Sequence, residues 1–188
     1  GMCRIGPLVE RACQLEMPAM AITDHGAMYG VIDFYVACRD AGIKPIIGCE
    51  VYLAPRTRHD TDREIDRHPT HLVLLAENEA GYKNLIKMVT AAHLEGFWYK
   101  PRVDWELLDK YREGLICLTA CKQGAVAQAI LQDNLPGAEE ILGRLTDIFG
   151  KDSVYLEIMN HFLPGQAEVI EGKAELSRRT GLQLVATN

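Results

Sequence analysis

The sequence lacks the short motifs that mark most cofactor and nucleophile sites. It contains no GxGxxG fingerprint and no Walker A loop, so the Gly-rich phosphate-binding loops of nucleotide-binding enzymes are not indicated. No Ser-His-Asp arrangement is suggested, and the carboxylates show no pattern that resembles a polymerase two-metal site. The six cysteines show no CxxC spacing, which favours reduced, buried thiols in a cytosolic protein.

Long apolar runs and an excess of basic residues are also missing. No run approaches the roughly 18–20 apolar residues that a membrane-spanning helix needs. The first residues lack the basic-then-apolar pattern of a signal peptide, so we expect a cytoplasmic protein without a membrane partner. The formal net charge of −6 provides no global field that attracts nucleic acid, so any contact with DNA must be local or come from other parts of a larger chain.

The patterning of apolar residues predicts one α/β domain over residues 1–188. An apolar fraction of 48% suits a single domain with a sizeable core. Short apolar runs alternate with amphipathic stretches, and near-continuous apolar runs are typical of parallel strands buried on both faces. The predicted strands are 19–22, 45–53, 71–76, 115–119, 154–158 and 182–186, and the predicted helices are 7–15, 29–41, 78–94, 104–111, 123–131, 137–149 and 166–179. This alternation favours a parallel sheet of about six strands.

The order of the elements indicates an incomplete barrel. The first predicted element is a helix rather than the strand that it would normally follow, and the last strand ends at the final residue, so the chain looks trimmed at both ends. Unpaired strand edges would remain, from which we expect weak stability or an oligomer that covers the edges. The charged stretch 56–68 lacks apolar periodicity and is predicted to be an exposed loop.

Four potential metal ligands are expected at points where a strand meets a loop. They are His25, Glu50, His71 and Cys121. Because about a hundred residues separate the first from the last, only a fold that gathers strand ends around one point, such as an α/β barrel, would bring them together. Imidazole, carboxylate and thiolate ligands together suit zinc or a similar transition metal.

Each of the four also has an ordinary structural interpretation. A single histidine at a strand end is usually a hydrogen-bonded core or loop residue, and Cys121 alone would more often be a small buried hydrophobe. Glu50 is the strongest candidate, because burying a carboxylate in an apolar strand costs free energy unless it meets a cation. Asp24 could hold His25 in one tautomer, as carboxylates do behind metal-bound imidazoles.

The other histidines are weaker candidates. His59 and His68 lie in the charged loop, where solvation is expected, and His93 lies late in a helix, where the helix dipole explains it. His161 follows the predicted strand 154–158 and stays a lesser candidate.

One segment, 97–102, mixes aromatic residues with two cations. Its sequence FWYKPR could stack bases and contact phosphates through Lys100 and Arg102. The alternative is an ordinary connector whose aromatic residues cover the core, and this second interpretation is favoured.

Six segments carry a family resemblance. They are 21–26 (AITDHG), 42–52 (GIKPIIGCEVY), 71–76 (HLVLLA), 95–102 (EGFWYKPR), 114–121 (GLICLTAC) and 185–188 (VATN). They resemble the PHP (polymerase and histidinol phosphatase) domain of the alpha subunit of bacterial DNA polymerase III. The resemblance covers essentially the whole chain. It implies a PHP-type distorted (β/α)7 barrel, here without its first strand, with a metal cluster at the carboxyl ends of the strands.

The same resemblance implies a zinc or manganese cofactor. Family ligands carry over onto His25, Glu50, His71 and Cys121, with Glu50 bridging two ions and with Glu50 and His25 as catalytic residues. The family's opening His-x-His pair and closing Asp-x-His pair have no counterpart in the chain. A further family ligand, which precedes a glycine resembling Gly1, is also absent. The full metal cluster is therefore not expected here.

The implied parent is a DNA-directed DNA polymerase, a nucleotidyltransferase of DNA replication. Its PHP domain would be a metal-dependent 3′–5′ exonuclease or phosphoesterase, and the isolated chain, without a polymerase palm, should be nearly inactive. The implied partners are the remainder of the alpha subunit, DNA through that parent, and a proofreading exonuclease subunit. Two alternatives stay open: a non-catalytic platform that docks the proofreading exonuclease, and a stand-alone PHP phosphoesterase of the histidinol-phosphatase type.

Overall fold

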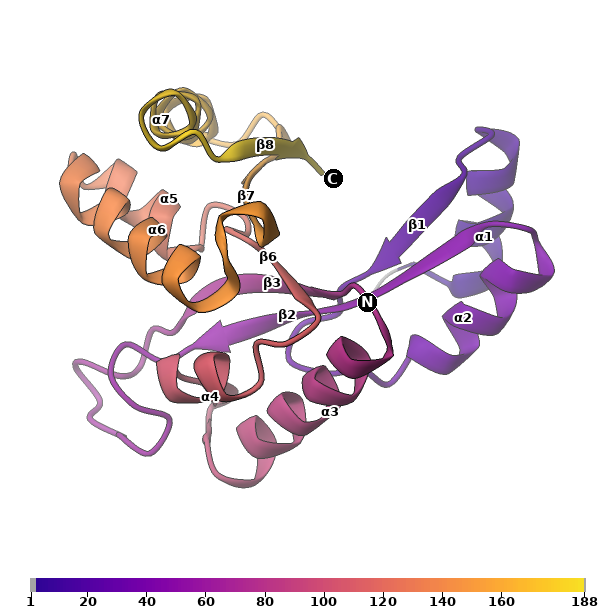
Figure 1. Cartoon of the computed structure of the whole chain (residues 1–188), viewed down its shortest axis with the longest axis horizontal. Helices are drawn as coiled ribbons and strands as arrows, with labels where there is room; N and C mark the ends of the chain where they lie inside the picture. Colours follow the sequence, from indigo (N-terminus) through magenta and orange to yellow (C-terminus); the bar gives the residue numbers. More distant parts are fainter. Residues whose placement is uncertain (1–2, 188) are drawn as a thin grey trace.

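An eight-stranded sheet forms the centre of the fold. The computed structural model describes residues 3–187, and the parts of the resemblance at Gly1 and Asn188 lie outside the described residues. The strands are β1 (Ala19–Ile22), β2 (Lys44–Leu53), β3 (Thr70–Ala76), β4 (Phe97–Trp98), β5 (Lys100–Val103), β6 (Leu115–Leu118), β7 (Val154–Ile158) and β8 (Gln183–Ala186). Their order is β4-β5-β2-β3-β6-β7-β8, and β1 pairs with the first half of β2 (Figure 1).

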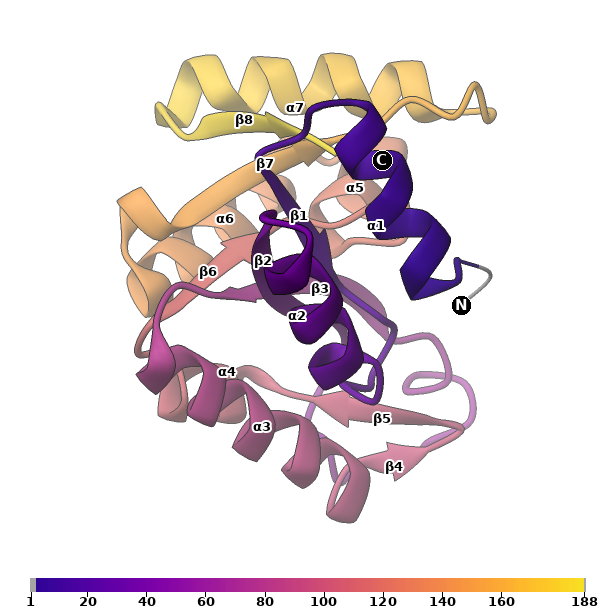
Figure 2. The same cartoon turned by 90° about the vertical axis from the view of Figure 1, so that its right-hand side faces the viewer.

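Helices cover the outside of this sheet. Those among the described residues are α1 (Ile5–Gln14), α2 (Val31–Asp40), α3 (Glu79–Leu94), α4 (Trp105–Lys110), α5 (Ala125–Leu131), α6 (Leu135–Phe149) and α7 (Gln166–Thr180). Figure 2 shows α7 along β8 at one end of the sheet and α3 and α4 near the other. Asn78 caps α3, because its side chain accepts a hydrogen bond from the Gly81 N–H.

The sheet curls into an open half-barrel and does not close (Figure 1). Among the described strands, β8 pairs only with β7, and β1 pairs only with β2. The prediction of an incomplete α/β barrel is thus confirmed. Its main core lies between the sheet and helices α3 to α7, and Leu74, Leu85 and Leu156 are fully buried there.

The prediction of an all-parallel sheet is wrong at β3. This strand runs antiparallel to both of its neighbours, β2 and β6. A parallel return would need a crossover connection, usually a helix, whereas residues 54–69 contain no helix. The chain therefore turns back beside β2. This reversal places the start of β3 next to the end of β2, where Tyr52 pairs with His71.

A short hairpin replaces the predicted connector at 97–102. Strands β4 and β5 pair antiparallel, and Tyr99 forms the turn between them with φ 58. Strand β5 then pairs parallel with the end of β2. A two-residue strand and a proline inside the next strand leave little periodicity in the sequence to reveal a hairpin.

The charged loop 56–68 is less exposed than predicted. Its Asp66 is fully buried and Arg58 is buried as well, although His59 and His68 are exposed as expected. The Asp66 carboxylate accepts a hydrogen bond from Arg56 Nε at 3.0 Å, and Arg58 pairs with Asp104 outside the loop, so the buried charges of this loop have partners. Within the described residues, no helix combines the length and the apolar character needed to cross a membrane.

Candidate metal centre

Three of the four candidate ligands share one small volume. One donor atom from each of His25, Glu50 and His71 lies within 4.8 Å of the other two. Nδ1 of His71 lies 2.6 Å from Oε1 of Glu50, and Nδ1 of His25 lies 3.5 Å from the same oxygen. The carboxylate therefore stands between the two imidazoles.

Cys121 lies beside this group. Its Sγ is 3.9 Å from Glu50 Oε1 and 3.9 Å from His71 Nδ1. The loop that carries it is tied to β3, since the His71 N–H donates to the Gln123 carbonyl at 3.0 Å. The thiol thus faces the Glu50–His71 pair from the β6 side. The structure brings all four predicted ligands to one place, from four different segments.

Main-chain pairing explains how distant residues meet. His25 follows β1 and forms a parallel bridge with Glu50, in which the Gly26 N–H donates to the Glu50 carbonyl at 2.8 Å. Glu50 lies within β2 and not, as expected, at a strand end. His71 lies at the start of β3, and this antiparallel strand brings it to the same rim as the ends of its parallel neighbours.

Gly26 fixes the turn that presents His25. Its φ is 61, and a Cβ at this position would lie 2.8 Å from Pro101 Cγ and 3.0 Å from a Tyr52 ring atom. Only glycine therefore fits this conformation and this space. His93 supports the turn from α3, since its Nε2 lies 2.8 Å from the Gly26 carbonyl oxygen. From the sequence, His93 was explained by the helix dipole alone, and its contact with Gly26 was not predicted.

One side of the centre is open and the other is enclosed. The side chain of His25 is 57% exposed, whereas those of Glu50 and His71 are 15% and 17% exposed. The Tyr52 ring covers the group, with its centroid 6.1 Å from that of His25 and 5.1 Å from that of His71. Hydrogen bonds to Cys121 and Glu50 raise the pKa of His71 to about 9, so at neutral pH the metal-free imidazole carries a proton that a bound metal ion would have to displace.

The donor types suit a tetrahedral metal ion, and three of the four donors lie within 4.8 Å of one another. Ligands bound at 2.0–2.3 Å around such an ion lie about 3.3–3.6 Å apart. The His25–Glu50 separation of 3.5 Å and the Cys121 separations of 3.9 Å are close to this range. The 2.6 Å contact between His71 and Glu50 is a hydrogen bond, which would lengthen once a metal replaced the shared proton.

Asp24 supports the site through its main chain, and its predicted role behind His25 stays a prediction. Its main-chain oxygen accepts from the Glu50 N–H at 3.1 Å and from Cys49 Sγ at 3.3 Å. Asp24 thus fixes β2 against the end of β1.

The prediction of Arg102 as a phosphate contact is wrong. Arg102 is 1% exposed, and its guanidinium donates to the carbonyls of Gly96 and Arg58 and lies over the Trp98 ring. Arg102 therefore stabilises the fold around the hairpin and is not available to a phosphate. Lys100, predicted together with it, is exposed.

Two buried charges behind Cys121 were missed. Lys173 on α7 is 1% exposed and donates to the main-chain oxygens of Ala120 at 2.9 Å and Glu157 at 2.7 Å. Ala120 has φ 57, a conformation uncommon outside glycine, so this bond helps to hold the loop that presents Cys121. Burial lowers the pKa of Lys173 to about 8 and raises that of Glu157. Glu157 sits in an apolar strand, the same signal that singled out Glu50.

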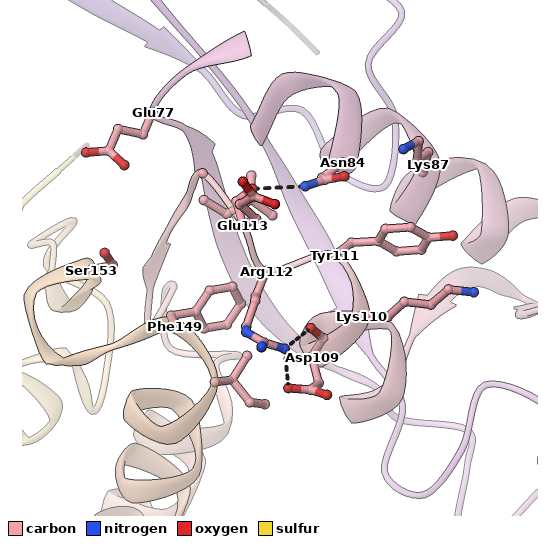
Figure 3. A pocket seen from close by; sticks show the side chains of 13 residues that line it. Glu77, Asn84, Lys87, Asp109, Lys110, Tyr111, Arg112, Glu113, Phe149 and Ser153 are labelled. Atoms are coloured by element: carbon pink, nitrogen blue, oxygen red, sulfur yellow. Dashed lines mark hydrogen bonds and ion pairs between the residues drawn. The ribbon is translucent and has the colours of Figure 1, made fainter. Parts of the chain in front are cut away.

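A separate cavity lies near the C-terminal end of β3, away from the candidate metal ligands. Its volume is about 670 Å³, and its charged lining residues are Glu77, Lys87, Asp109, Lys110, Arg112 and Glu113 (Figure 3). Cations and acids alternate there, and Arg112 is paired with Asp109 at 2.8 Å. The cavity lacks the convergent donors of the His25–Glu50–His71 group. We therefore place the candidate site at the metal centre.

Sequence comparison assigns most of the chain to one protein family. A family model described as "PHP domain" matches residues 1–161. The chain belongs to the PHP family. The matched stretch of this PHP domain contains all four candidate ligands, from His25 to Cys121.

Relatives of the PHP chain are DNA polymerase III alpha subunits. The chain is 42% identical over 189 residues to the DNA polymerase III alpha subunit of Treponema pallidum, and this alignment covers 100% of the chain and 16% of the relative. It is 45% identical over 175 residues to the DNA polymerase III alpha subunit of Thermus aquaticus, and this alignment covers 92% of the chain and 14% of the relative. The PHP chain therefore spans about one sixth of the length of these curated relatives.

Solved structures support the same fold. A protein described as a metal-dependent phosphoesterase from Bifidobacterium adolescentis aligns with a TM-score of 0.61 over 99% of the PHP chain and 82% of its own, at 12% identity. An amidohydrolase from Chromobacterium violaceum aligns with a TM-score of 0.59 over 100% and 82%, at 13% identity. At these identities the likeness concerns the fold alone.

Proposed function

We propose that this chain is the PHP domain of a bacterial replicative DNA polymerase, a single domain whose centre holds a zinc or manganese ion for phosphodiester hydrolysis. The observation that carries this proposal is the convergence of His25, Glu50 and His71 within 4.8 Å, with Cys121 beside them. The similarity of the whole chain to DNA polymerase III alpha subunits supports the choice of parent. Such a parent would work in the cytoplasm on DNA, with the remainder of the alpha subunit as its partner.

Each ligand has a distinct role in the proposed reaction. A bound metal ion would polarise a phosphate oxygen and lower the pKa of a bound water. Glu50, which faces both histidines, would balance half of the charge of a divalent ion. His71 and Cys121 would hold the enclosed side, and His25, which is exposed, would border the substrate.

The two other functions are less well supported. A purely structural platform that docks a proofreading exonuclease has no need for converging donors, yet three donors lie within 4.8 Å of one another and Cys121 lies beside them. A stand-alone phosphoesterase would be expected to have relatives of its own length, whereas the chain covers only 16% of the first of these relatives.

Thiol labelling tests whether Cys121 is a ligand. In the metal-free protein we expect iodoacetamide to modify exposed Cys13 quickly and half-buried Cys121 more slowly. Cys49 and Cys117 should stay unmodified, because burial raises the pKa of Cys49 to about 12 and that of Cys117 further. Zinc should protect Cys121 and leave Cys13 unchanged, as measured by peptide mass spectrometry. Equal labelling of Cys121 with and without bound zinc would remove it from the ligand set.

A nucleotide-release assay tests the reaction. With labelled single-stranded DNA and manganese or zinc, we expect the 188-residue chain to release nucleotide only slowly, since four donors suffice for one ion and a two-ion displacement needs more. That slow release should fall to the metal-free background in Glu50→Ala and in His25→Ala. Equal rates in the wild type and both variants would contradict hydrolysis at this centre. Rapid release that both variants abolish would show instead that one ion is enough.

A further inference from the structure

A second cavity lies directly against the metal centre. Its volume is about 320 Å³, within the range of small-molecule sites, and His71 and Tyr52 form part of its wall. Tyr52 also stacks on His25, so one ring touches the centre and the cavity together. A molecule in this cavity would therefore lie beside the proposed ion.

The cavity carries positive charge. Arg67, His68 and Lys100 line it, and none of the described residues in its wall is acidic. The Lys100 ammonium lies 5.3 Å from the centre of the Tyr52 ring, one side chain away from His25 and His71. The larger cavity of Figure 3 differs in this respect, because acids there neutralise the cations. A phosphate group is thus favoured beside the metal centre and not at the far end of β3.

An aromatic side chain stands at the rim of the same cavity. Tyr99 lines it, and its side chain is largely exposed at 65%. The β4–β5 hairpin, in which Trp98 pairs with Lys100, holds Tyr99 in the left-handed region at φ 58. A tyrosine is uncommon in that conformation, and its ring is left facing solvent beside two cations. An aromatic ring next to phosphate-binding cations is the usual surface for an unpaired nucleic-acid base.

We propose that this cavity, named here the Lys100 cavity after the residues Arg67, His68, Tyr99 and Lys100 that line it, binds the terminal nucleotides of single-stranded DNA. Lys100 and Arg67 contact backbone phosphates, and Tyr99 stacks on a base. The proposal rests on the proposed phosphodiester hydrolysis and names the substrate of that site. A volume of about 320 Å³ admits nucleotide-sized groups and not a duplex. Because the chain has a net charge of −6, the affinity should be modest and local.

The test is binding of a fluorescent oligothymidylate to the metal-free chain in EDTA, measured by anisotropy over a range of salt concentrations. Lys100→Gln should raise the Kd about five-fold and lower the magnitude of the salt slope by about 0.7, the loss of one phosphate contact. Tyr99→Ala should raise the Kd about ten-fold, while Tyr99→Phe should bind as the wild type does. Lys110→Gln is the matched control, since that exposed lysine lies 5.2 Å over the Tyr111 ring in the cavity of Figure 3.

Several outcomes would overturn the proposal. These are no binding by the wild type in EDTA, equal losses in Lys110→Gln and Lys100→Gln, and competition by thymidine monophosphate as strong as that by the oligomer, which would indicate a small phosphate ester. Metal content of Glu50→Ala tests the proposed function separately. If that variant keeps its metal but Lys100→Gln still weakens DNA binding, the hydrolytic centre fails and the Lys100 cavity stands.

Discussion

Replacing Glu50 with alanine is expected to lower the affinity for zinc or manganese by about a hundred-fold or more. Its Oε1 lies 2.6 Å from His71 Nδ1 and 3.5 Å from His25 Nδ1, so it is the donor that the others share. It is also the only carboxylate in the group of His25, Glu50 and His71, and without it the ion would keep two neutral imidazoles and the Cys121 thiolate. Competition with a chromophoric chelator measures the affinity, and mass spectrometry measures the bound metal.

The matched control for this variant is Glu113→Ala. Glu113 is exposed, lines the cavity of Figure 3 and accepts a hydrogen bond from Asn84 through its main-chain oxygen. We expect its metal affinity to equal that of the wild type. Circular dichroism should show both variants folded, which separates loss of a ligand from loss of the fold. Unchanged metal affinity in folded Glu50→Ala would exclude Glu50 as a ligand and with it the proposed centre.

Local patterns in the sequence were enough to locate six of the eight strands and the candidate donors. The predicted strand 45–53 corresponds to β2, and within it Glu50 stood out because a carboxylate among apolar residues needs a cation or a proton nearby. In the structure His71 meets this need, because its protonated imidazole contacts the Glu50 carboxylate at 2.6 Å. The same reasoning applied to Glu157 in β7 would have found a second buried carboxylate, which is 5% exposed.

The direction of strands and the pairing of charges could not be found in the same way. Antiparallel β3 has the same apolar pattern as a parallel strand, and only the absence of a helix in 54–69 reveals its direction. Arg102 and Lys100 are both cations beside aromatic residues and, two residues apart in β5, lie on the same face. Arg102 is nevertheless buried and Lys100 exposed, because Arg102 pairs with Tyr52 of β2 whereas Lys100 pairs with Trp98 at the turn of the hairpin. The charged sequence of 56–68 suggested a solvated loop. A sequence with opposite charges that are buried as ion pairs cannot be distinguished from one whose charges face water.

The pairing of Arg58 with Asp104 leads to the second large expected effect. Asp104→Ala should lower the free energy of unfolding by about 3 kcal/mol, because it removes the most buried of the three carboxylates that contact Arg58 and also removes a helix cap. Asp104 is 3% exposed, and it accepts from Arg58 N at 2.9 Å and from Arg58 Nη1 at 3.0 Å. It also caps α4 by accepting from the Leu107 N–H at 3.1 Å. Urea unfolding followed by circular dichroism measures the change.

Two variants separate the causes of this loss. Asp104→Asn keeps an oxygen for the cap but loses the ion pair, so an intermediate loss is expected. Asp109→Ala removes only an exposed pair with Arg112, which should change stability by less than about 1 kcal/mol. A loss in Asp104→Ala no larger than in Asp109→Ala would show that the buried pair does not hold the loop.

The same substitution links loop order to DNA binding. Loop 56–68 carries Arg67 and His68 into the Lys100 cavity, whereas Asp104 is not among the residues that line it. If the Arg58–Asp104 pair positions the loop, Asp104→Ala should weaken oligothymidylate binding under conditions where the protein is still folded, and Asp109→Ala should not. Unchanged DNA binding in a folded but destabilised Asp104→Ala protein would mean that Lys100 and Tyr99, held by the β4–β5 hairpin, bind the strand without the loop.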